Sequence, residues 1–137
     1  MDRPRFTEAH LSHTLCNGGC RMNQKDKGNA AEHLAAAFLE RKGFQILERN
    51  FRCRAGEIDL IAKEGDCVVF AEVKYRSSTS LGRPEEAVDQ RKQRRICRAA
   101  LYYLTTHGLL ESPVRFDVIA VLGEEITHFE HAFEFQE

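Results

Sequence analysis

The amino-acid sequence predicts an α/β fold in which a mixed sheet of about five strands is flanked by helices. Three observations predict this fold. Strand-like segments rich in Val, Ile, Leu and Phe recur along the chain. Two segments with helical spacing of apolar residues lie before and between them. The resulting order, which is a helix, a strand, a hairpin, a long helix and two strands, is typical of a sheet with helices on its faces.

The first helix is predicted to follow Asn29. Asn29 suits the N-cap position and Glu32 the third helical position, which is the arrangement of a capping box. Gly43 ends the segment. Because its apolar residues recur at helical spacing, we expect the helix to pack on the sheet through Ala31, Leu34, Ala35, Phe38 and Leu39.

Residues 44–51 predict the first strand, and residues 56–76 predict a two-stranded hairpin. Gly65 and Asp66 lie between two apolar runs, and a Gly-first dipeptide in this position indicates a tight turn. If these two residues form the loop, Glu64 pairs with Cys67, and the register continues toward the open end of the hairpin.

This register brings four charged side chains to one end of one sheet face. Asp59 lies opposite Glu72, and Glu57 lies opposite Lys74. Two carboxylates directly opposite each other destabilise a sheet, so a cation is expected between them. The oxygen ligands suit Mg²⁺ or Mn²⁺. The alternative is an ordinary solvated cluster of salt bridges, which contributes little to stability.

A long helix and two strands complete the chain. Pro84 fits the first helical position, and the helix is expected to end before Gly108. Residues 114–122 form a near-continuous apolar run, as in a central strand, and residues 126–129 form the last strand. Asp117 interrupts the central run, either as a partner for a basic residue near the charged cluster or in a strand-end salt bridge. The predicted buried stripe of the helix is Val88, Ile96, Ala99, Ala100, Tyr103 and Leu104.

The composition is that of one globular domain. A chain of 137 residues can bury a single core, and 42% apolar and 30% charged residues are ordinary for a soluble protein. No apolar run approaches the roughly 20 residues of a membrane helix, so we expect a cytoplasmic protein with no membrane partner. The net charge of -1 does not attract a polyanion, although basic residues cluster between residues 83 and 98.

Residues 1–27 predict a disordered or loosely held extension, and residues 28–137 a single domain. The extension contains four residues of zinc-ligand type, but their spacing matches no strong zinc-finger pattern, and an unstructured tail is the alternative. They are His10, His13, Cys16 and Cys20. The protein has five cysteines, an odd number, and we expect reduced thiols.

Several motifs resemble known families. An acid on one strand followed by E-x-K on the next resembles the active site of restriction-endonuclease-like nucleases, here Asp59, Glu72 and Lys74. The segments GEIDLIA, FAEVKYR, RFDVIAV and HAF resemble the YraN family of small bacterial proteins, over about residues 28–133. The resemblance implies a restriction-endonuclease-like fold and the hydrolysis of phosphodiester bonds.

The resemblance also implies roles for individual residues. Asp59, Glu72 and the backbone carbonyl of Val73 would hold Mg²⁺ or Mn²⁺. Lys74 would orient or deprotonate the attacking water. Glu32 would add a carboxylate from the first helix, and its alternative role is the helix cap described above.

Basic residues on both sides of the cluster are candidates for binding the nucleic-acid backbone. The alternatives are solvated arginines at strand edges and, for the lysine of the long helix, a side chain that extends from the edge of the core to solvent. The candidates are Arg52, Arg54, Arg76, Arg91, Lys92 and Arg95.

These features predict a metal-dependent endonuclease that acts on DNA. In size the chain is similar to archaeal Holliday-junction resolvases, which implies branched or junction DNA as substrate and a homodimer as the assembly. The alternatives are a non-catalytic nucleic-acid-binding module of the same fold and a protein-interaction factor. Fold alone does not decide among them.

Overall fold

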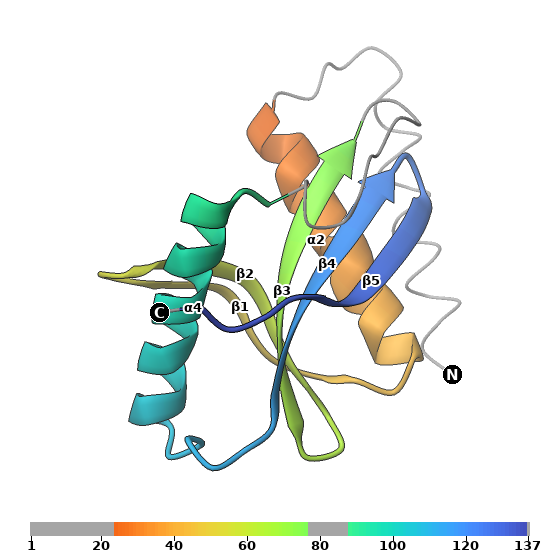
Figure 1. Ribbon diagram of the computed structural model, residues 1–137. Coiled ribbons are helices and arrows are strands. Elements are labelled where there is room, and N and C mark those ends of the chain that lie inside the picture. The colour runs from red at the N-terminus through yellow and green to blue at the C-terminus, as the bar shows by residue number, and fades with distance from the viewer. Residues whose placement is uncertain (1–23, 77–87, 137) are drawn as a thin grey trace.

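The structure of the protein, a computed structural model, describes residues 24–76 and 88–136 (Figure 1). Its sheet has the strand order β1-β2-β3-β4-β5, in which β3 and β4 are parallel and the other neighbours are antiparallel. The predicted mixed sheet flanked by helices is therefore confirmed. The elements are α2 (Gln24–Arg41), β1 (Gln45–Cys53), β2 (Gly56–Glu64), β3 (Cys67–Arg76), α4 (Gln90–Thr106), β4 (Val114–Leu122) and β5 (Glu125–Phe133).

The two helices cover opposite faces of the sheet. Helix α4 packs on the face that carries Phe70 and Val118, where Ile96 and Tyr103 are buried. Helix α2 packs on the other face through its small and apolar residues, Ala31, Ala35, Ala36 and Leu39. Figure 1 shows α2 behind the upper part of the sheet and α4 beside it. The chain is therefore built as three layers with an apolar core on each side of the sheet.

The helix starts differ from the predictions. Helix α2 begins at Gln24, so Asn29 lies inside it and the predicted capping box with Glu32 does not form. Gly28 and Asn29 are poor helix formers, but the helix continues through both into the alanine-rich segment that follows. Helix α4 begins at Gln90, where the side chain of Asp89 accepts a hydrogen bond from the backbone N–H of Lys92 at 2.8 Å. The predicted start at Pro84 lies outside the described residues.

The bounds of the strands agree more closely with the predictions than the starts of the helices do. The bounds of β4 are those predicted, while β5 continues to Phe133, four residues beyond the predicted end.

Cys53, Cys67 and Cys97 are free thiols, as expected. Residues 1–23 of the predicted extension, which include the four candidate zinc ligands, lie outside the described residues. Residues 24–27, which were predicted to belong to the same extension, begin helix α2 instead. In the described ranges, no helix is both long and apolar enough to cross a bilayer.

Asp117 lies at the centre of a buried polar network on the α2 face. Its carboxylate accepts two hydrogen bonds from Arg115, both at 2.9 Å, one from the backbone N–H of His131 at 3.0 Å, and contacts His128 Nε2 at 2.7 Å. Burial opposes ionisation, but the hydrogen bonds from His128 and Arg115 outweigh it, so the pKa of Asp117 is lowered. Of the two predicted roles, the salt bridge is the one observed.

We expect Asp117→Asn to destabilise the fold by about 3–5 kcal/mol, because Arg115 loses its buried counter-charge and keeps only the exposed carboxylates of Glu64 and Glu130. The folded-state pKa of Asp117 is lowered, so its contribution is present above the ordinary pKa of 3.8 and is lost as the pH falls below it. Urea unfolding at several pH values measures both effects. The control is Asp66→Asn at the exposed hairpin turn, and equal losses in the two variants would contradict the assignment.

Candidate functional site

The hairpin of β2 and β3 opens into a fork. Near the turn its register is the predicted one, with Glu64 opposite Cys67, and the pairing continues as far as Leu60 and Ala71. Beyond that point β2 pairs only with β1, and β3 pairs only with β4. Figure 1 shows β1 and β2 turning toward α4 while β3 continues beside β4.

Because the strands part, two predicted cross-strand pairs do not form. Asp59 and Glu72 lie just beyond the last paired residues, and Glu57 lies opposite Arg52 of β1 instead of Lys74. The Arg52 Nε and Glu57 Oε1 atoms are 3.8 Å apart, and both side chains are exposed. The predicted pairs assumed that the ladder continues to the open end of the hairpin, and this assumption is wrong.

The side chain of Asp59 bridges the two strands at the fork. Its Oδ2 atom accepts a hydrogen bond from the backbone N–H of Val73 at 2.9 Å, in the place of a backbone partner. The N–H and C=O groups of one residue in an extended strand point to the same edge of that strand. The carbonyl of Val73 is therefore directed to the same side of β3 as Asp59.

A cavity of about 420 Å³ lies at the fork beneath the first half of α4. Helix α4 comes close to the β1–β2 turn there, because a Cβ atom at Gly56 would lie only 3.3 Å from the backbone oxygen of Arg95. Gly56 thus permits the close approach of α4. The cavity is lined by Arg54, Ala55, Gly56, Glu57, Asp59, Glu72, Lys92, Arg95 and Ile96.

The two carboxylates in this cavity are held together against their mutual repulsion. Glu72 is 5% exposed, and burial followed by the charge of Asp59 raises its pKa to about 7. Burial also raises the pKa of Asp59, although its hydrogen bonds to Val73 and Glu72 oppose the shift. The carboxyl groups share a hydrogen bond, and they retain a proton below about pH 7.

Lys92 supplies the positive charge closest to the pair. Its Nζ atom is 2.7 Å from Glu72 Oε2. Burial of Lys92 opposes its charge, but the hydrogen bond to Glu72 outweighs burial and raises the pKa of Lys92. Lys92 was predicted as a residue that contacts nucleic acid, and in the structure it is the counter-ion of Glu72.

The oxygen atoms at the fork fit a small divalent ion. Among the described residues, no three His, Cys, Asp or Glu side chains come close enough together to hold a metal. Mg²⁺ is commonly bound by one or two carboxylates and keeps several waters, so it does not need a third side chain. Asp59, Glu72 and the carbonyl of Val73 provide such a donor set.

Glu32 approaches the fork from the opposite face of the sheet. It is partly buried on α2, and burial and the charge of Asp59 raise its pKa. A hydrogen bond with the side chain of Asn50 opposes this shift. Asn50 has a φ of 53°, in the left-handed region that asparagine tolerates better than most residues. No local sequence motif marks Asn50, so its contact with Glu32 could not be predicted from the sequence.

With this geometry established, comparison with known proteins identifies the family. The model of the uncharacterised protein family UPF0102 matches residues 31–121. The chain belongs to this family. A UPF0102 protein of Lachnoclostridium phytofermentans is 51% identical, with 82% of this chain and 97% of that protein covered. A UPF0102 protein of Geotalea uraniireducens is 43% identical, with 83% and 94% covered. The resemblance of the sequence motifs to the YraN family is confirmed.

One solved structure resembles the UPF0102 chain weakly. The structure of SfsA from Pyrococcus furiosus in complex with Ca²⁺ shares 16% sequence identity, with a TM-score of 0.34. The match covers 82% of this chain and 65% of SfsA. A TM-score this low supports no statement about function.

Some of the remaining predicted site residues of the UPF0102 protein lie at the fork, and others do not. Lys74 follows Glu72 by two residues and lies on the same side of β3, and its charge favours the ionised form of Glu72. However, Lys74 does not line the cavity. Arg54 and Arg95 do line it, and Arg91 is exposed on α4. The side chain of Arg76 lies outside the described residues.

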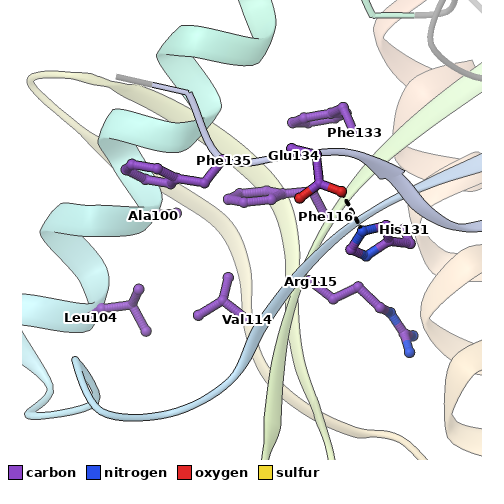
Figure 2. A pocket seen from close by; sticks show the side chains of 9 residues that line it. All are labelled: Ala100, Leu104, Val114, Arg115, Phe116, His131, Phe133, Glu134 and Phe135. Carbon is purple, nitrogen blue, oxygen red and sulfur yellow. Dashed lines mark hydrogen bonds and ion pairs between the residues drawn. The ribbon is translucent and has the colours of Figure 1, made fainter.

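A second, smaller cavity lies between α4, β4 and the C-terminal segment (Figure 2). Its volume is about 230 Å³, and its walls are mostly apolar, with Leu104 and Phe116 among them. The polar groups at its edge include His131, whose Nε2 atom is 2.8 Å from Glu134 Oε2. This cavity has no pair of adjacent carboxylates, so it is the less suitable of the two for hydrolytic chemistry.

We expect the metal-free protein to lose stability as the pH rises from about 4.5 to about 7. Folded Glu72 keeps its proton up to about pH 7, whereas an unfolded glutamate loses it near 4.5. The folded state therefore binds more protons in this window, and its stability falls with rising pH, by about 3 kcal/mol. Urea unfolding of the wild type and of Glu72→Gln in EDTA measures the difference.

The variant removes the titrating group, so its stability should depend less steeply on pH over the same range. Glu111→Gln between α4 and β4 is the control, since Glu111 is exposed and the same substitution there should leave the pH dependence unchanged. Parallel stability curves for the wild type and Glu72→Gln would contradict the raised pKa.

Proposed function

We propose that this protein is a metal-dependent endonuclease that hydrolyses phosphodiester bonds of DNA. The observation that carries this proposal is the pair of adjacent carboxylates, Asp59 and Glu72, in a cavity that also contains Lys92, Arg54 and Arg95. Carboxylates held together in spite of repulsion favour a divalent cation. Cationic side chains around them favour a polyanionic substrate.

The residues of the fork have distinct roles in this proposal. Asp59, Glu72 and the carbonyl of Val73 would hold Mg²⁺ or Mn²⁺, and Glu32 would add a carboxylate through water. When bound, the ion supplies Lewis acidity at the phosphate and lowers the pKa of water. Lys74 orients the attacking water and neutralises developing charge.

The basic residues bind the DNA backbone in this scheme. Arg54 and Arg95 line the cavity and are suited to the non-bridging phosphate oxygens. Lys92 leaves Glu72 when a cation replaces its charge and then binds phosphate. We propose branched or junction DNA as substrate, by resemblance to archaeal Holliday-junction resolvases, and a homodimer because both strands of a junction must be cut.

A second candidate function is a non-catalytic nucleic-acid-binding module of the same fold. The position of Lys74 favours it, because Lys74 does not line the cavity while Lys92 forms the ion pair with Glu72. A binding module needs the cationic residues but not a lysine that activates water. The two candidates differ in whether the phosphodiester bond is cleaved.

We expect the wild-type protein to nick at least one member of a panel of junction, flap, single-stranded and duplex DNA in Mg²⁺ or Mn²⁺. Lys74→Ala should lower the cleavage rate by at least about 100-fold and leave DNA affinity within a few-fold, because the lysine acts on the water. Lys63→Ala, near the hairpin turn, is the matched control. Binding without cleavage of any substrate would exclude the enzyme and support the binding module.

We expect titration calorimetry to detect Mn²⁺ binding to the wild type and to lose it in Asp59→Ala, because this substitution removes a ligand and the bond that holds the fork. Glu57→Gln is the control, since Glu57 lines the same cavity but pairs with Arg52 on the exposed side. Circular dichroism checks that Asp59→Ala is folded. Unchanged Mn²⁺ binding in folded Asp59→Ala would exclude the proposed metal site.

A further inference from the structure

The outer face of α4 carries a straight stripe of three arginines that ends at an aromatic ring. Arg91, Arg95, Arg98 and Tyr102 are spaced by four, three and four residues, which aligns them along one face of a helix. All four side chains are exposed. The buried residues of α4, from Gln93 to Leu104, occupy the opposite face of the helix. The stripe is therefore exposed along most of the length of α4, and it borders β1 and the β1–β2 turn at Tyr102 and Arg95.

The arginines of this stripe have no acidic partner in the part of the chain that the structure describes. Elsewhere on the protein, exposed charges do pair, as Arg52 does with Glu57. The net charge of the protein is -1, so the stripe is a local concentration of positive charge. Three aligned, unpaired guanidinium groups repel one another and suit a polyanion that lies along the helix.

Tyr102 adds an element that phosphate binding alone does not need. The residue is 52% exposed, and its ring lies 6.3 Å from the ring of Phe51 on β1, at a tilt of 33°. The neighbouring ring restricts the orientation of an otherwise solvated tyrosine. An exposed ring next to cationic side chains is the combination on which unpaired bases stack, whereas bases in a duplex present no free face.

The stripe overlaps the cavity at the fork, which is the candidate active site. Arg95 belongs to both, since it lines the cavity at the fork and is the second arginine of the stripe. Seven residues separate Arg95 from Tyr102, a rise of about 10 Å along the helix. A nucleic-acid strand that leaves the cavity would therefore contact Arg98 and then Tyr102 within a few nucleotides.

We propose that the outer face of α4 binds an unpaired nucleic-acid strand, with Arg95 and Arg98 on its phosphates and Tyr102 stacked on a base. This inference rests on the proposed nucleic-acid function and specifies the substrate as one that carries a single-stranded arm. It assigns to Tyr102 and Arg98 a role in substrate selection that the reaction at the fork does not require.

The test measures binding of a fluorescein-labelled 20-nucleotide oligo(dT) and of its duplex by anisotropy, in EDTA so that no cleavage occurs. Tyr102→Ala is expected to weaken binding of the single strand about 5- to 150-fold, which is the range for loss of one base stack. Duplex binding should change less than twofold. Tyr102→Phe keeps the ring and should bind the single strand like the wild type.

Salt titration tests the arginines separately. For the single strand, Arg98→Ala should reduce the slope of log affinity against log salt by about 0.7, the value for one lost phosphate contact. Arg41→Ala removes an equal charge from the exposed last turn of α2 and should leave the slope unchanged. Equal effects of the two substitutions would overturn the assignment of Arg98.

The outcomes separate this inference from the proposed function. If Tyr102→Ala binds the single strand like the wild type, or if the wild type binds only the duplex, the inference fails while the proposed function stands. If the wild type binds neither DNA, the inference fails, and the cleavage panel with junction and flap DNA decides the proposed function. If sedimentation shows that Tyr102→Ala dissociates a dimer and leaves single-strand affinity unchanged, the face is a self-association surface and the inference is overturned.

Discussion

The hydrogen bond between the Asp59 carboxylate and the backbone N–H of Val73 is the constraint on which the candidate site depends. A β-ladder normally continues while each strand offers backbone partners to the next. Here a side chain takes the donor of β3, the ladder ends at Leu60 and Ala71, and the strands diverge. The opening between them becomes the cavity, and it places a buried carboxylate beside Glu72. One side-chain contact thus creates both the space and the charge of the site.

Two buried carboxylates of this protein show how environment decides the role of an acid. Asp117 has hydrogen bonds from Arg115, His128 and a backbone N–H, its pKa is lowered, and it serves the fold. Glu72 is buried and lies against another acid, and its ion pair with Lys92 does not offset these effects, so its pKa is raised. The first arrangement is fully satisfied. The second arrangement holds two acids together, and in the proposed function a bound cation would relieve this unfavourable electrostatic energy.

Helix α4 connects the core, the cavity and the surface. Its buried residues form one side of the hydrophobic core, Lys92 reaches Glu72, and its outer arginines lie in one exposed stripe. Gly56 allows this helix to approach the β1–β2 turn closely enough to close the cavity. Any shift of α4 would therefore change the position of Lys92 relative to the carboxylates.

The sequence by itself determined the α/β class, the hairpin turn at Gly65 and the bounds of β4, because apolar periodicity and turn residues act over short distances. It also marked Asp59 and Glu72 as neighbours. Only the tertiary structure decided that the ladder stops at Asp59 and that Lys92, and not Lys74, pairs with Glu72. Both outcomes depend on where a helix packs and on which atoms compete for one backbone donor. The competing atoms belong to residues that are distant in the chain, so no local sequence pattern predicts which contact forms.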